Sequence, residues 1–96
     1  MSRMSGATAL TKSLQQYGVN TIFALPGAQL DPMFDALYHA QDVFRVIHTR
    51  HEQGAAYMAF GYAQSTGQVG TCLVVPGPGL LNASAGLSTA FACGAR

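Results

Sequence analysis

Short apolar runs alternate along this chain with longer segments of helical periodicity. The apolar runs are residues 21–25, 43–48 and 70–75, and the first and last are each followed directly by a Pro-Gly pair. Runs of this length that are rich in β-branched and aromatic residues predict strands buried on both faces. Their alternation with helical segments predicts an α/β fold, in which helices cover both faces of a parallel sheet.

Local signals mark where the first two helices begin and end. Ser5 is expected to cap the first helix, and Gly18 follows its last turn, where a left-handed conformation is favoured. Asp31 is expected to cap the second helix, with Pro32 in its first turn. Each helix carries its apolar residues at intervals of three and four, which predicts one face packed on the sheet.

Two further helices complete the pattern. Residues 52–66 place alanines at helical spacing and end at Gly67, and a last helix is expected over about residues 80–93. The small side chains of the third helix permit close packing against a neighbour. The whole pattern predicts one incomplete three-layer domain with about three strands and four helices.

The composition limits the partners of such a domain. Charged residues are 9% of the chain, against roughly 25% in an ordinary soluble domain, so much of the surface is expected to be covered by other protein. Five basic and four acidic residues nearly cancel, which argues against nucleic acid. We also expect no membrane partner, a cytoplasmic location, and no disulfide between Cys72 and Cys93, both of which are predicted to be small buried residues.

Three connecting segments should meet where the parallel strands end, because ligands of such sheets bind beyond the carboxyl ends of the strands. They are residues 26–30, 49–53 and 76–82, and the last contains Pro76-Gly77-Pro78-Gly79. Prolines stiffen such a turn and glycines allow close approach to its backbone, although many similar loops are purely structural. A dinucleotide fingerprint is disfavoured, because Asn82 stands in place of its third glycine.

Glu52 is the only glutamate in the chain and directly follows the second predicted strand. Its placement alone favours a structural role, in which the carboxylate complements the helix dipole. Gln29, taken alone, is a loop residue at the same end of the predicted sheet. His48 and His51 lack further ligands at suitable spacing, so no metal site is expected on this chain.

Two motifs in the expected order resemble those of thiamine-diphosphate-dependent enzymes. One is Arg50-His51-Glu52-Gln53-Gly54-Ala55-Ala56-Tyr57-Met58-Ala59 followed by Gly61-Tyr62-Ala63, and the other is Gly77-Pro78-Gly79-x-x-Asn82. The resemblance covers residues 5–96 and is strongest to the acetolactate synthase, benzaldehyde lyase and 2-oxo acid decarboxylase group. Within that group, Pro26-Gly27-Ala28-Gln29 is more similar to the benzaldehyde lyase or hydrolase branch than to the Pro-Gly-Gly of acetolactate synthases.

The resemblance implies a catalytic role for Glu52, which would hydrogen-bond the N1′ nitrogen of the aminopyrimidine and promote deprotonation of the thiazolium ring. The protein's share of such chemistry is orientation and electrostatics, since the cofactor is the electron sink. The implied cofactor-binding residues are Glu52, Pro26, Gly27, Gly77, Pro78, Gly79 and Asn82. Ala28 and Gln29 are implied to face the substrate, a 2-oxo acid or aldehyde.

The resemblance further implies that residues 1–96 are the first part of the pyrimidine-binding domain of a lyase, decarboxylase or carboligase. The middle and diphosphate-binding domains would be absent, together with the ligands of diphosphate and Mg²⁺, and the parent enzyme could also hold FAD. The partner would be the diphosphate-binding domain of another subunit in a homodimer or homotetramer. We expect the chain alone to be inactive and its third strand to leave an apolar edge. The alternative is a non-catalytic, flavodoxin-like binding or interaction module.

Overall fold

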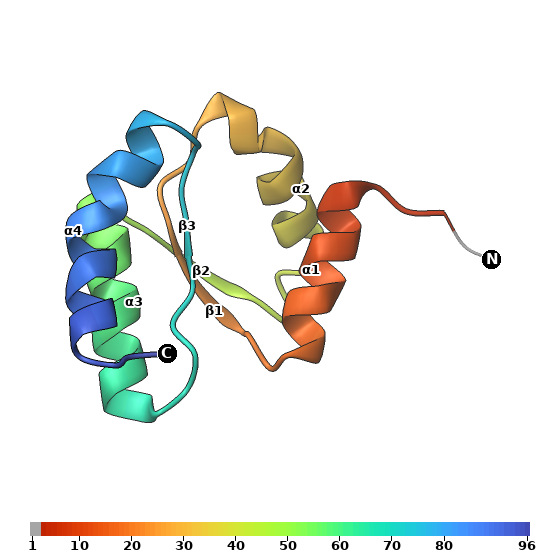
Figure 1. The fold of residues 1–96 in the computed structure, drawn as a ribbon. Helices are drawn as coiled ribbons and strands as arrows, with labels where there is room; N and C mark the ends of the chain where they lie inside the picture. Colours follow the sequence, from red (N-terminus) through yellow and green to blue (C-terminus); the bar gives the residue numbers. More distant parts are fainter. Residues whose placement is uncertain (1–2) are drawn as a thin grey trace.

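A computed structural model describes residues 3–96 and shows strands alternating with helices (Figure 1). The elements in chain order are α1 (Gly6–Gln16), β1 (Thr21–Ala24), a 3-10 turn η1 (Ala28–Leu30), α2 (Asp31–His39), β2 (Arg45–His48), α3 (Glu52–Thr66), β3 (Cys72–Leu73) and α4 (Pro78–Ala92). This order confirms the predicted α/β class, with three strands and four α-helices.

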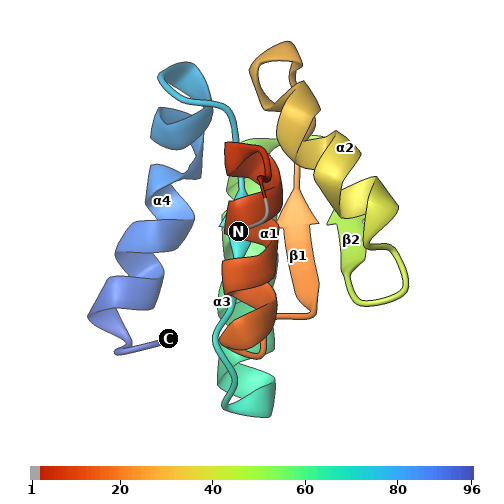
Figure 2. The ribbon, with the colours of Figure 1, turned by 90° about the vertical axis from the view of Figure 1, so that its right-hand side faces the viewer.

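The sheet is parallel, and β1 is its central strand. The strand order is β2-β1-β3, with Ala24 of β1 opposite His48 of β2 and Leu73 of β3. Helices α1 and α2 cover one face, while α3 and α4 lie on the other (Figure 1). Seen from the side of α1, β2 lies at one edge of the sheet and α4 lies on the opposite side of the molecule (Figure 2). This is the predicted three-layer arrangement.

The core is divided between the two faces of the sheet. On the face of α1 and α2 the buried residues include Ile22 and Leu37, the two largest side chains that are almost fully buried. On the other face, Phe23 packs against Ala55 and Ala59 of α3. The alanines let α3 approach the sheet closely, as the composition of residues 52–66 predicts.

Helices α3 and α4 pack closely because small residues face each other. A Cβ atom added to Gly86 of α4 would lie 2.6 Å from the Cβ of Ala56 on α3. That distance is shorter than non-bonded carbon atoms normally approach, so a side chain there would require the two helices to shift. Ala83, one turn earlier on α4, is completely buried.

Several helix ends follow the sequence prediction. Ser5 is the N-cap of α1, and its hydroxyl accepts a hydrogen bond from the amide of Thr8 at 3.1 Å. Gly18, after α1, and Gly67, which caps α3, have positive φ angles of 80° and 73°. Helix α3 covers residues 52–66, as predicted.

Other boundaries differ from the prediction. The third strand is two residues long instead of six, and α4 begins at Pro78 rather than residue 80. Asp31 is the first residue of α2 and not its cap, because the preceding turn η1 leads directly into the helix. The second strand starts at Arg45, since residues 41–43 form a turn after α2.

The two cysteines have different surroundings. Cys72 is partly buried in β3, and burial raises the pKa of its thiol above the usual value for cysteine. Cys93 is exposed just after α4, so the prediction that it is buried is wrong. Residue 93 follows the last buried position of α4, Gly86, by two turns, and no later element in the described chain covers it. Both thiols are free.

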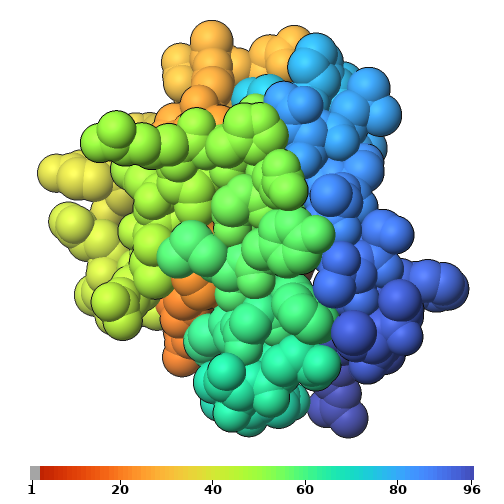
Figure 3. Space-filling model, turned by 90° about the vertical axis from the view of Figure 1, so that its left-hand side faces the viewer, coloured from red at the N-terminus to blue at the C-terminus, as the bar shows by residue number. Residues whose placement is uncertain are grey.

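Much of the large exposed apolar surface lies on α3 and α4, which run side by side across one face of the molecule (Figure 3). The side chains involved are Tyr57, Met58, Leu80, Leu81, Leu87 and Phe91, of which Phe91 is 89% exposed. The predicted apolar edge at β3 is present, but it is less exposed than the apolar surface of α3 and α4, because Cys72 and Leu73 are only partly accessible. Among residues 3–96, no helix is long and apolar enough to cross a bilayer.

Candidate functional site

The three segments that follow the strands lie together at the carboxyl end of the sheet. The amide of Thr49 donates to the carbonyl oxygen of Ala24 at 2.9 Å, and the amide of Leu25 donates to that of Leu73 at 3.3 Å. A Cβ atom at Gly27 would overlap the side chain of Val75, so the first segment directly touches the residue before the third segment. Parallel pairing thus brings together residues that are distant in sequence.

Glu52 is the first residue of α3 and is half-buried. The start of this helix is held by His51, whose Nδ1 accepts a hydrogen bond from the amide of Gln53 at 3.0 Å. The Thr49 hydroxyl donates to the carbonyl oxygen of His51 at 2.9 Å and holds the same turn. The backbone that carries Glu52 is therefore restrained on both sides.

The Glu52 carboxylate reaches across to α4. The Asn82 side-chain nitrogen Nδ2 donates to Glu52 Oε1 at 3.2 Å. The other oxygen, Oε2, lies near Gly79, where an added Cβ would be 3.5 Å away. The two carboxylate oxygens thus have different neighbours, an amide donor and a glycine turn.

The Pro-Gly turn before α4 is open on the side of Gly77. This residue has φ 72° and ψ −117°, and no atom lies within 4 Å of the place that its Cβ would take. Pro78 is the first residue of α4, and Gly79 is buried against Val75. A side chain at residue 77 would be strained by the positive φ, and one at residue 79 would collide with Val75.

The first connecting segment presents its residues to solvent. Pro26, Ala28 and Gln29 are exposed, and Gly27 is half-buried against Val75. Ala28 and Gln29 belong to η1, the 3-10 turn that the sequence did not predict. The proposal that these two residues face the substrate remains a prediction.

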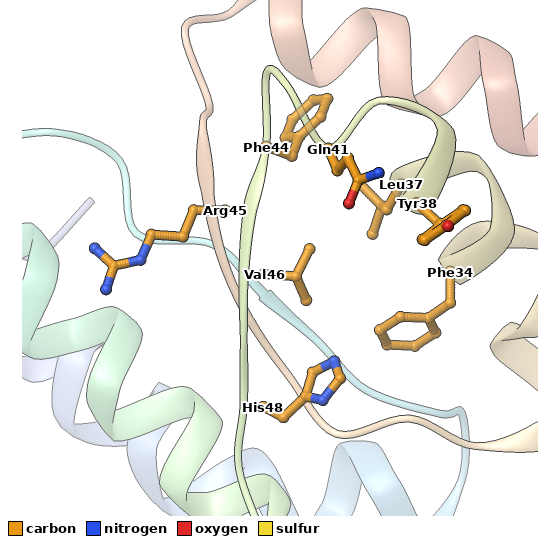
Figure 4. A pocket seen from close by; sticks show the side chains of 8 residues that line it. All are labelled: Phe34, Leu37, Tyr38, Gln41, Phe44, Arg45, Val46 and His48. Carbon is orange, nitrogen blue, oxygen red and sulfur yellow. The ribbon is translucent and has the colours of Figure 1, made fainter.

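The two histidines have separate positions. The His48 ring lies edge-on to Phe34, with 6.1 Å between ring centroids, and points into a cavity of about 530 Å³ between α2 and β2 (Figure 4). His51 is occupied in capping α3. Within residues 3–96 there is no group of three or more His, Cys, Asp or Glu side chains that could hold a metal ion.

The cavity beside His48 is separate from the Glu52 site. Apart from His48, it is lined by Phe34, Leu37, Tyr38, Gln41, Phe44, Arg45 and Val46, which belong to α2, β2 and the turn between them. None of the residues that the resemblance assigns to the cofactor lines it. The chemistry expected of this chain therefore depends on the rim around Glu52 and not on this hollow.

Comparison with known proteins assigns the family. The family model described as "Thiamine pyrophosphate enzyme, N-terminal TPP binding domain" matches residues 4–96. The chain belongs to this family. The resemblance found in the two sequence motifs is thereby confirmed, and thiamine diphosphate is the cofactor that the family binds.

The chain is similar to acetolactate synthases from distant organisms. It is 47% identical to the acetolactate synthase of Arthrospira platensis over 93 residues, which are 95% of this chain and 16% of that protein. It is 44% identical over 89 residues to the probable acetolactate synthase large subunit of Methanocaldococcus jannaschii, covering 93% of this chain and 15% of that protein. It is 44% identical over 88 residues to the acetolactate synthase isozyme 2 large subunit of Escherichia coli, covering 92% of this chain and 16% of that protein. The chain thus spans about one sixth of the length of these relatives.

Sequence reasoning missed three features of the rim. The capping role of His51 is not predicted from the sequence, although a histidine before a helix start can accept an amide hydrogen bond. Val75 was read as a strand residue, yet it is the side chain that leaves no space at Gly27 and Gly79. The bond from Asn82 to Glu52 has no local signal, because 30 residues separate the two.

Proposed function

We propose that this chain forms the pyrimidine-binding side of a thiamine-diphosphate site and supplies Glu52 as the carboxylate that activates the cofactor. The observation that carries the proposal is the position of Glu52 at the carboxyl end of a parallel sheet, with Oε2 turned toward the glycine turn at residues 77–79. The family assignment supports the same cofactor.

The rim around Glu52 fits a flat heteroaromatic ring. Gly77 is open to solvent and Gly79 carries no side chain that could stand between the turn and Oε2. Pro78 stiffens the backbone between them, so the turn keeps its shape without a ligand. The residues that would hold the pyrimidine are Glu52, Pro26, Gly27, Gly77, Pro78 and Gly79, while Asn82 contacts Glu52 directly.

Thiamine diphosphate, when bound, supplies the electron sink for reactions at a carbonyl carbon. The chain's own contribution is acid–base chemistry. Glu52 can hold a proton at Oε2 and share it with a ring nitrogen, which general acid–base catalysis requires of a group within hydrogen-bond reach. Gly79 of the glycine turn lies beside this oxygen on the protein side.

The remainder of the proposal concerns the complete enzyme. Residues 1–96 would be the first part of its pyrimidine-binding domain, and a diphosphate-binding domain of another subunit would bring Mg²⁺ to the site. The exposed apolar residues of α3 and α4 support burial by such a subunit in a homodimer or homotetramer. The substrate would be a 2-oxo acid or aldehyde, the reaction that of a lyase or transferase, and FAD a further cofactor of the middle domain.

The test is Glu52→Gln in the complete enzyme that contains this chain. We expect hydrogen–deuterium exchange at the thiazolium carbon of the bound cofactor to slow by about 10² or more, since an amide cannot take up the proton. The matched control is Asp31→Asn, which removes the acidic group at the first residue of α2 and should leave exchange unchanged.

Exchange within threefold of the parent in Glu52→Gln would remove Glu52 from this role. The carboxylate would then only complement the helix dipole, as Asp31 does, and its loss would lower stability by about 0.3 to 1 kcal/mol. In that case, the non-catalytic binding module becomes the better description of the chain.

A further inference from the structure

Asn82 makes its side-chain hydrogen bond to Glu52 and thereby links the second turn of α4 to the first residue of α3. We propose that Asn82 is a positioning residue, which sets the orientation of the Glu52 carboxylate, and not a group that binds the cofactor itself. This inference rests on the proposed role of Glu52.

The hydrogen bond from Asn82 restrains the Glu52 side chain. Glu52 is half-buried at a helix start, and the bond from Asn82 is the side-chain hydrogen bond found for its carboxylate among residues 3–96. A glutamate side chain loses considerable rotational freedom when it is held in one orientation, so a donor that holds it in advance spares that cost during catalysis. The amide of Asn82 can donate in this way because its NH₂ group faces Oε1.

The two oxygens of the Glu52 carboxylate have different neighbours, so a hydrogen bond to one of them orients the other. Oε1 accepts from Asn82, while Oε2 lies on the side of Gly79, at 3.5 Å from the place of an added Cβ. Holding Oε1 therefore directs Oε2 toward the glycine turn. This is the oxygen that the proposed function assigns to proton sharing.

The packing of the two helices holds Asn82 in place. Gly79, Ala83 and Gly86 are buried positions of α4, and Asn82 is an exposed residue beside them, next to Ala83 in the chain. At Gly86 the helices are in such close contact that an added Cβ would lie 2.6 Å from Ala56 Cβ. This contact leaves little freedom in the spacing of α3 and α4, so the donor and the carboxylate are kept within hydrogen-bond distance.

The first test examines orientation without cofactor. Asn82→Asp keeps the shape of the side chain but replaces the donor by an oxygen, and Asn82→Ala removes both. In crystal structures of the unliganded complete enzyme, we expect the Glu52 carboxylate to leave its parent orientation in both variants. Asn20→Asp, at the opposite end of β1, is the matched control and should leave Glu52 unchanged. An unchanged Glu52 orientation in both Asn82 variants would overturn the inference.

The second test separates positioning from direct binding by a double-mutant cycle. In the complete enzyme, Asn82→Ala should slow exchange at the thiazolium carbon by about 10- to 100-fold, the range expected for a misplaced catalytic group. The dissociation constant of thiamine diphosphate should stay within threefold. In a Glu52→Gln background, Asn82→Ala should slow exchange by less than a further twofold, because the group that it positions is already gone.

The outcomes distinguish this inference from the proposed function. Equal slowing by Asn82→Ala in both backgrounds would show that Asn82 acts on the cofactor directly and would overturn the inference alone. Parent-like exchange in Asn82→Ala together with slow exchange in Glu52→Gln would also overturn only the inference. Parent-like exchange in Glu52→Gln would overturn both.

Discussion

The contact between α3 and α4 can be tested with two glycines that differ only in their surroundings. Gly61 of α3 and Gly86 of α4 are both inside helices. Nothing lies within 4 Å of a Cβ added at Gly61, whereas one at Gly86 would lie 2.6 Å from Ala56 Cβ and 3.0 Å from the Tyr57 amide nitrogen. Alanine should therefore have opposite effects at the two positions.

The magnitudes follow from two opposing contributions. Replacing glycine by alanine inside a helix stabilises a protein by up to about 1 kcal/mol, and Gly61→Ala should show this gain. Gly86→Ala receives the same gain but must also force the helices apart, and overpacking a core costs about 1 to 3 kcal/mol. We expect Gly86→Ala to be net destabilising by up to about 2 kcal/mol.

The assay is unfolding of the 96-residue chain followed by circular dichroism, at a concentration where sedimentation shows one species. In a chain of this size, 1 kcal/mol corresponds to about 4 to 8 °C in Tm. Gly61→Ala should raise Tm and Gly86→Ala should lower it. If both variants raised Tm equally, the close approach of α3 and α4 would be refuted, and with it the restraint on Asn82.

Three further predictions concern the rim, the thiols and the chain as a whole. Gln29→Ala in the complete enzyme should change the preference between 2-oxo acids and aldehydes while cofactor affinity stays within a few fold; loss of affinity with unchanged preference would place the turn against the cofactor. Cys93 should react with iodoacetamide at pH 8 well before Cys72, since Cys93 is exposed and burial raises the pKa of the Cys72 thiol, leaving less thiolate; equal rates would contradict this. If the 96-residue chain contacts only the pyrimidine end, as proposed, its Kd for thiamine diphosphate with Mg²⁺ should be about 1 mM or weaker, equivalent to about 4 kcal/mol. Calorimetry should then show no saturation up to about 0.1 mM, and micromolar binding by a monomer would show a self-sufficient site.

Local chemistry explains what could be predicted from the sequence alone. The bounds of α3 were predicted correctly because the helix begins directly after a strand segment and ends at Gly67, whose positive φ is readily adopted only by glycine. The Ser5 cap depends on residues three positions apart, and it was also predicted. The α/β class followed from the alternation of periodicities, which each segment shows independently of the others.

Strand length was not predictable in the same way. Residues 70–75 have strand composition throughout, yet only Cys72 and Leu73 are paired as a strand. A strand exists where a neighbour supplies hydrogen-bond partners, and β3 has β1 on one side only. Likewise, Cys93 is exposed although its segment is apolar, because burial requires another element to cover the residue.

The position of Glu52 at the rim was determined by the sequence, since a glutamate only a few residues after a parallel strand lies near the carboxyl end of the sheet. What its two oxygens contact was decided by tertiary structure. Asn82 and Gly79 approach Glu52 only because Gly86 and Ala56 let α3 and α4 pack closely. No pattern within one segment contains that information, because it depends on the volume of side chains 30 residues apart.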